Sequence, residues 1–256
     1  MENAAAEEHL AAEHGLSLLI ETGDHRILFD AGQTGAFVDN AEKLGLDLSM
    51  VDLAVLSHGH YDHSGGLLRF LECNDRAKIY VNQYAFDCCW HGEDHYIGVD
   101  PRLRDCDRVV AVGETLQIAE GVTLRACNEK EKSYPADSFG LTVLENGMFR
   151  PDSFRHEQYL LVEEGQKRIL FSGCSHKGIL NIVEWFRPDV LLGGFHFMKL
   201  DPERDAAVLE AAAENLLQYP TTYYTGHCTG EGPFAFLKQR MGDRLHAVHS
   251  GTIIEI

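Results

Sequence analysis

The segment Ser57-His58-Gly59-His60-Tyr61-Asp62-His63-Ser64-Gly65-Gly66-Leu67 decides the fold class of this chain. It follows the apolar run 52–56, which has the pattern of a short buried strand. A helical pattern begins behind it at residues 67–71. The segment is therefore a loop at the carboxyl end of a strand, where α/β proteins usually place their ligands.

Three imidazoles and a carboxylate within this loop have the composition of a metal site. His58 and His60 are two residues apart, so on extended chain they point the same way. Asp62 and His63 follow after the turn. The loop can therefore face two adjacent metal positions, one bound by His58 and His60 and the other by Asp62 and His63.

The net charge and the cysteine content indicate the cellular compartment and which partners to expect. The net charge is −18, from 22 Lys and Arg against 40 Asp and Glu, and such a surface repels phosphate backbones. The apolar runs are too short to cross a bilayer. Seven cysteines with no paired spacing fit a reducing compartment. We expect a cytoplasmic protein with a small-molecule substrate and no nucleic-acid or membrane partner.

Two similar sequence segments predict the architecture. Residues 26–32 (Arg-Ile-Leu-Phe-Asp-Ala-Gly) resemble residues 168–174 (Arg-Ile-Leu-Phe-Ser-Gly-Cys). Each copy ends a predicted hairpin and precedes a helix, and then an apolar strand that begins with Asp and leads to His58 or His196. We therefore predict an α/β fold with two mixed sheets packed face to face and helices outside, a four-layer αββα sandwich. Residues 1–256 form one domain, with residues 1–12 as a mobile or weakly helical lead.

The rest of the chain yields further strands and one segment without a period. Strands are predicted near residues 78–81, 109–112, 122–126 and 141–144, and a final strand near 252–256. Residues 84–107 show no clear period, and we interpret them as a loop that covers a site.

The pattern His58-x-His60-x-Asp62-His63, with the upstream run 28–32, resembles the metallo-β-lactamase superfamily. The resemblance extends through most of the chain and implies an αββα fold with a mono- or dinuclear metal site. Several segments are similar to a subgroup whose members are named as metal-dependent hydrolases or as dihydropterin ribofuranosyl-aminobenzene phosphate synthases: residues 13–17, 57–67, 157–158, 173–176, 193–196 and 226–230.

The resemblance implies a ligand set. His58 and His60 would hold the first metal, and Asp62, His63 and the late His227 would hold the second. The position shared between the metals falls at residues 173–176, where Cys174 and His176 are alternatives. We favour His176, because an imidazole suits a hydrolytic site and a thiolate is softer and oxidisable.

Other residues are weaker candidates in the same comparison. His156, with Glu157 beside it, occupies the place of a further ligand to the first metal. Asp30 would orient the histidine loop through hydrogen bonds. His196 follows a strand and can act on the substrate, while Asp62 can orient the nucleophile as well as bind metal.

The resemblance implies an enzyme with two divalent ions. We expect Zn²⁺, with Mn²⁺ or Fe²⁺ as alternatives, and a metal-bound hydroxide that attacks a small ester or phosphorylated substrate. The alternative is a synthase that joins a dihydropterin pyrophosphate to an aminobenzene riboside phosphate. A redox role is disfavoured because diiron members carry Glu where this chain has His60. A non-catalytic protein is disfavoured because all four loop ligands are present.

Overall fold

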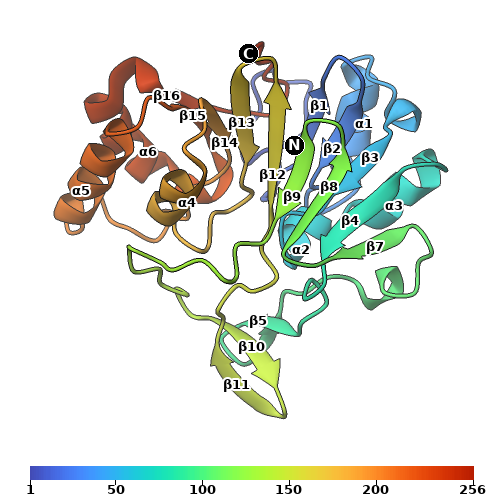
Figure 1. The fold of residues 1–256 in the computed structure, drawn as a ribbon, viewed down its shortest axis with the longest axis horizontal. Helices are drawn as coiled ribbons and strands as arrows, with labels where there is room; N and C mark the ends of the chain where they lie inside the picture. The colour runs from blue at the N-terminus through green and yellow to red at the C-terminus, as the bar shows by residue number, and fades with distance from the viewer.

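The computed structural model describes residues 1–256 as two mixed β-sheets packed face to face with helices outside (Figure 1). The first sheet has the strand order β1-β2-β3-β4-β7. Its strands are β1 (Leu18–Glu21), β2 (Arg26–Phe29), β3 (Leu53–Val55), β4 (Lys78–Asn82) and β7 (Val109–Val112). β1 and β2 form an antiparallel hairpin, and β3, β4 and β7 continue from β2 in parallel.

The second sheet repeats this design. Its order is β16-β15-β14-β13-β12-β9-β8, and β12 and β13 form a hairpin that β14, β15 and β16 extend in parallel. The strands are β8 (Thr115–Ala119), β9 (Val122–Arg125), β12 (Tyr159–Glu164), β13 (Lys167–Phe171), β14 (Val190–Leu192), β15 (Thr222–Thr225) and β16 (Leu245–Ala247). The predicted αββα architecture is confirmed. The similar segments 26–32 and 168–174 occupy equivalent places in its two halves.

Helices cover the outer face of each sheet (Figure 1). Those of the first half are α1 (Ala36–Lys43) and α3 (Leu67–Cys73), and those of the second are α4 (Ile179–Phe186), α5 (Ala206–Leu217) and α6 (Glu231–Met241). A short helix, α2 (Tyr61–Ser64), lies within the histidine loop. No helix of the chain combines the length and the apolar character that crossing a bilayer would demand.

The alternation of side chains along each strand builds three apolar layers. Ile27 and Phe29 point into the layer between the sheets, while Leu28 points into the layer under α1 and α3. Ile169 and Leu170 divide in the same way in the second half. Strands buried on both faces have continuous apolar sequences, and this is why the sequence identifies these strands clearly. Each fully buried side chain of this size contributes about 1.5–3 kcal/mol.

A small third sheet lies beyond the sandwich, at the bottom of Figure 1. Its order is β11-β10-β5-β6, formed by β5 (Cys89–His91), β6 (His95–Tyr96), β10 (Leu141–Glu145) and β11 (Met148–Pro151). The predicted strand near 141–144 is present. The interpretation of residues 84–107 as an irregular loop was wrong in part, because β5 and β6 are too short to show a period and pair with distant β10.

Both ends of the chain differ from expectation. We expected a mobile or weakly helical lead, but residues 1–12 contain no helix and are tied to the rest of the chain. Glu2 is buried, and Ala5 forms a parallel bridge with Ser250. The final strand lies at Leu245–Ala247 rather than near 252–256, because residues 245–247 continue the parallel register beside β15.

Candidate metal centre

The carboxyl ends of four strands, β3 in the first sheet and β13, β14 and β15 in the second, bring the predicted ligands together. The histidine loop follows β3, residues 174–176 follow β13, His196 follows β14, and His227 follows β15. Parallel strands end at the same edge of their sheet, and the two sheets place these edges against each other. Side chains from both halves therefore meet in one place.

The first group of donors consists of His58, His60 and His176, all of them buried. One ring nitrogen of each lies within 4.8 Å of the others. The Nε2 atoms of His58 and His176 are 3.2 Å apart. The loop after β3 thus supplies two imidazoles and the loop after β13 supplies the third.

The second group lies beside the first. His63 Nε2 is 3.2 Å from His227 Nε2 and 3.1 Å from Cys174 Sγ. Asp62 Oδ2 lies 3.3 Å from His227 Nε2 and 3.8 Å from His63 Nε2. Burial disfavours the ionised form of Asp62, but His63, His14 and His227 outweigh it and hold the pKa of this carboxyl well below its usual range.

Hydrogen bonds on the far side of the rings fix which nitrogen of each histidine carries the proton. His63 Nδ1 donates to Asp30 Oδ2 at 2.6 Å, and His227 Nδ1 donates to Asn3 Oδ1 at 2.9 Å. Asn3 Oδ1 also accepts the Gly15 N–H, which sets the orientation of the amide. In the neutral rings both Nε2 atoms therefore present lone pairs to each other.

The same reasoning applies to His58. The Ser57 hydroxyl donates to Asp30 Oδ2, so its oxygen accepts the His58 Nδ1–H at 2.8 Å. Asp30 thus orients His58 through Ser57 and His63 directly. Lone pairs that converge at about 3 Å repel unless a cation lies between them, so these residues fit a bound divalent metal.

The structure brings both alternatives of the shared position into the site. His176 belongs to the first group, whereas Cys174 forms a group with His58 and His63 and another with His227 and Cys228. Cys174 therefore lies between the two groups. Both residues face the site, because the turn after β13 is tight and Ser175 is in the left-handed region with φ 60°.

His156 and Glu157 lie behind the ligand loops. The His156 ring accepts the Gly59 N–H at Nδ1 and bonds Asp152 Oδ2 through Nε2, each at 3.0 Å. Glu157 accepts the N–H groups of His176 and Lys177, at 2.6 and 3.0 Å. These contacts hold the loop after β3 and the turn after β13 in place.

His196 lies beside His176 at the edge of the site. Its ring centroid lies 4.2 Å from that of His176 and 5.3 Å from that of Phe139. Burial, reinforced by the charges of His227 and Lys199, lowers the pKa of His196 to about 4. The ring is therefore neutral at pH 7.

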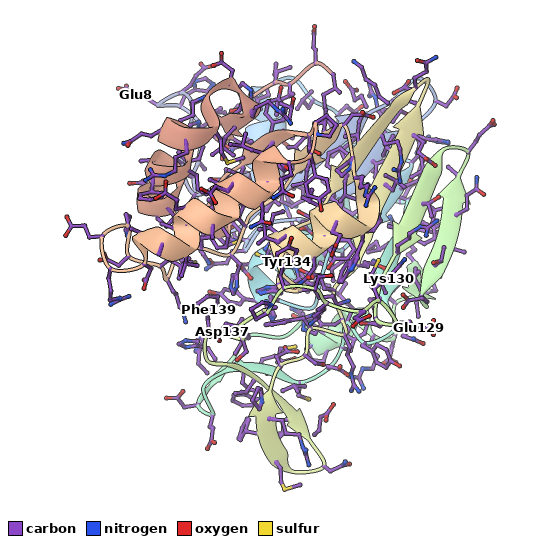
Figure 2. The ribbon with its side chains drawn as sticks, turned by 60° about the vertical axis from the view of Figure 1, so that its left-hand side comes forward. Glu8, Glu129, Lys130, Tyr134, Asp137 and Phe139 are labelled. Atoms are coloured by element: carbon purple, nitrogen blue, oxygen red, sulfur yellow. The ribbon has the colours of Figure 1, made fainter.

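The segment 127–140 runs between the helices of the second half and the small sheet (Figure 2). Asn181 on α4 holds both backbone groups of Tyr134, at 2.8 and 2.9 Å, and Lys199 Nζ donates to the Phe139 carbonyl at 2.7 Å. These bonds place Phe139 against His196, so the segment forms one wall of the site. No residue spacing within the segment 127–140 predicts that it forms this wall.

Two donors near the second group were not predicted as ligands. His14 Nε2 lies 3.3 Å from Asp62 Oδ2. Cys228 is buried beside Cys174 and His227. Its position next to His227 in the sequence is the one signal that could have identified it.

A four-layer αββα sandwich with histidine, aspartate and cysteine donors at its strand ends is the architecture of the metallo-β-lactamase fold. Residues 11–127 match the family model of the metallo-beta-lactamase superfamily. The chain belongs to the metallo-β-lactamase superfamily, as the sequence resemblance predicted. Members of this superfamily are typically enzymes that bind divalent metal.

Three similar proteins cover almost the whole chain. An uncharacterised protein of Methanocaldococcus jannaschii is 30% identical over 96% of this chain and 94% of its own length. The 7,8-dihydropterin-6-methyl-4-(beta-D-ribofuranosyl)-aminobenzene-5'-phosphate synthase of the same organism is 28% identical, over 95% of this chain and 90% of its own length. A crystal structure described as a metal-dependent hydrolase of the beta-lactamase superfamily superposes with a TM-score of 0.81 and 28% identity, covering 100% of this chain and 96% of that one.

Proposed function

We propose that this chain is a hydrolase that uses two divalent metal ions to cleave a small ester or phosphorylated substrate. One observation carries the proposal: His58 of the first donor group and His63 of the second converge with Cys174 in a single group. The two positions are thus adjacent, as in two-metal sites, where the ions lie about 3.5–4 Å apart.

The donor set supports a ligand assignment. His58, His60 and His176 would hold the first ion, Asp62, His63 and His227 the second, and Cys174 lies between them. Imidazole with carboxylate and thiolate favours Zn²⁺, with Mn²⁺ and Fe²⁺ as alternatives. Such ions, when bound, lower the pKa of water to about 7 and polarise a carbonyl or phosphoryl group.

The chain's own residues orient the reaction. Asp62, ionised and held by His14 and His227, can accept a hydrogen bond from the attacking water. His196 is neutral, so it offers an N–H to the leaving group rather than a positive charge. Phe154 stacks on His176 at 4.4 Å between ring centroids, and with Phe139 it gives the site apolar walls suited to a planar group.

The synthase activity is the second candidate, and the similarity to the named synthase supports it. The same site would then activate a dihydropterin pyrophosphate for attack by an aminobenzene riboside phosphate. Pyrophosphate would be the leaving group. The two candidates differ in the acceptor, which is water in one and the aminobenzene compound in the other.

One set of assays separates them. Metal-free and zinc-restored protein would be tested on a nitrophenyl ester, on bis(nitrophenyl) phosphate, and on the pterin and aminobenzene pair with pyrophosphate detection. We expect metal-dependent hydrolysis that Asp62→Asn abolishes and that His249→Gln, at an exposed histidine outside the site, leaves unchanged. Hydrolysis that survives chelation would refute the proposal. Pyrophosphate release with no hydrolysis would favour the synthase.

A further inference from the structure

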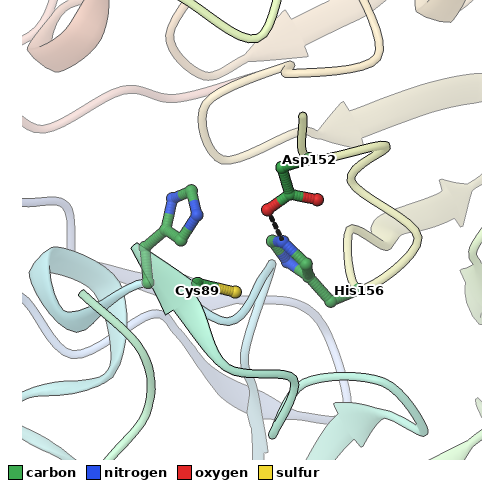
Figure 3. Close-up of side chains that lie close together, drawn as sticks. Cys89, Asp152 and His156 are labelled. Carbon is green, nitrogen blue, oxygen red and sulfur yellow. Dashed lines mark hydrogen bonds and ion pairs between the residues drawn. The ribbon is translucent and has the colours of Figure 1, made fainter. Parts of the chain in front are cut away.

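A second convergence of donor side chains lies behind His60. Cys89 on β5, and Asp152 and His156 on the connection between β11 and β12 (Figure 3), approach His60 from two separate segments. One donor atom of each lies within 4.8 Å of the others. We call these four residues the Cys89 cluster.

The Cys89 cluster is closed to solvent and contains an unpartnered polar atom. Cys89 and His156 are 0% exposed, His60 is 4% exposed and Asp152 is 7% exposed. The Nε2 atom of His60 is buried and has no hydrogen-bond partner. Leaving such an atom unsatisfied costs about 1–3 kcal/mol, so its environment requires an explanation.

The remaining donors are oriented by bonds on their far sides. His156 Nδ1 accepts the Gly59 N–H, which leaves Nε2 directed at Asp152 Oδ2, 3.0 Å away. The other carboxylate oxygen, Asp152 Oδ1, accepts the Phe154 N–H at 2.7 Å. Two imidazoles, a carboxylate and a thiol are thus presented to one small volume.

We propose that His60, Cys89, Asp152 and His156 form an additional divalent metal site that binds Zn²⁺. Tetrahedral zinc with bonds of about 2.0–2.3 Å separates its ligand atoms by about 3.3–3.8 Å. The 3.0 Å and 4.8 Å limits of the Cys89 cluster bracket this range, so side-chain shifts of about 1 Å or less complete the geometry. The thiolate and imidazoles favour zinc over magnesium or calcium.

His60 belongs both to the Cys89 cluster and to the first donor group. An imidazole carries two nitrogens on different edges of the ring, so His60 could serve both sites as an imidazolate. Binding would then release three protons, one each from the His60 ring, the His156 Nε2–H and the Cys89 thiol, and Asp152 would contribute its carboxylate. The new site would also fasten the small sheet to the histidine loop.

The adjacent cysteines provide a matched control for a test on the full chain. Cys88 is exposed and Cys89 is buried, so Cys88→Ser changes the same dipeptide without touching the cluster. Metal-free protein would be titrated with Co²⁺ while the bound equivalents and the near-ultraviolet thiolate-to-cobalt absorption are measured. We expect Cys89→Ser to lose one equivalent and part of this absorption, and Cys88→Ser to retain both.

Further measurements keep the test independent of folding and of the proposed hydrolase. Asp152→Asn should also lose one equivalent, and a zinc-edge anomalous map of wild-type crystals should show a peak among the four side chains. Cys174→Ser should change the absorption of the other metals and leave this peak in place. Equal equivalents and equal absorption in wild type and Cys89→Ser, or no anomalous peak in the cluster, would overturn the proposal, whether or not the protein hydrolyses any substrate.

Discussion

The Nε2 atoms of His63 and His227 face each other at 3.2 Å across the two halves of the sandwich, and each ring's Nδ1 is bonded to an acceptor. His63 follows a strand of the first sheet and His227 a strand of the second. In the neutral rings both Nε2 atoms are acceptors, so a cation between them would stabilise the contact. Metal binding at this contact would therefore join the two halves.

Asp30 should control metal affinity although it is not a ligand. The substitution Asp30→Asn removes the acceptor that orients His63 directly and His58 through Ser57. Losing such an outer partner typically weakens metal binding by roughly 10–100-fold. Competition with a chromophoric chelator measures the change. Asp39→Asn, on the exposed face of α1, is the control, and equal zinc affinity in both variants would contradict the assignment.

Glu157 should matter for stability. Its carboxylate accepts the His176 N–H, the Lys177 N–H and the Tyr159 hydroxyl in a buried environment. Glu157→Gln directs an amide NH₂ at donors and should lower the free energy of unfolding by about 2–3 kcal/mol, whereas Tyr159→Phe removes one donor and should cost about 1 kcal/mol. Urea denaturation of zinc-loaded protein measures both. The reverse order of effects would show that Glu157 does not hold the turn.

Removing the metals should destabilise the folded chain. A ligand that binds only the native state stabilises it by about 2.7 kcal/mol per site at a hundredfold excess over its Kd. We expect chelation to lower the melting temperature and zinc to restore it. His227→Asn should melt close to metal-free wild type and respond less to zinc. An identical melting temperature with and without chelator would contradict metal binding in the native state.

The neutral form of His196 should make the metal-free protein sensitive to acid. Its pKa is 6.5 as an ordinary histidine and about 4 in the folded chain. Between these values the unfolded state binds a proton that the folded state refuses, so stability falls as the pH decreases from 6.5 to about 4. His196→Gln removes this term. Unfolding midpoints measured at several pH values should show the stability of His196→Gln rising relative to wild type as the pH falls. A stability difference that does not change with pH would contradict the lowered pKa of His196.

The sequence predicted the fold because its local signals agree with one another. The apolar runs at 26–29 and 168–171 are buried on both faces, and the loop 57–67 has a spacing that few folds share. The structure also brings His176 and His227 to that loop, as the family resemblance implied, and their roles as ligands stay a prediction.

What the sequence could not provide depends on contacts between distant segments. The bond between Asn3 and His227 spans 224 residues, and no local pattern marks Asn3 as the partner of a ligand. The pairing of β5 with β10 joins residues about fifty positions apart, so Cys89 and Asp152 appear unrelated until both strands are in place. Cys174 and His176 are also not alternatives in space, since the turn after β13 directs both into the site.

The small sheet has an evolutionary consequence. Its strands come from two connections, one between β4 and β7 and the other between β9 and β12, and neither belongs to the repeated hairpin–helix–strand unit of the sandwich. Outside Cys89, Asp152 and His156, these connections can therefore change in length and sequence without shifting the strand ends that carry His58, His63 and His227. Within such a lineage, variation can accumulate in the small sheet while the frame of donor residues is inherited unchanged.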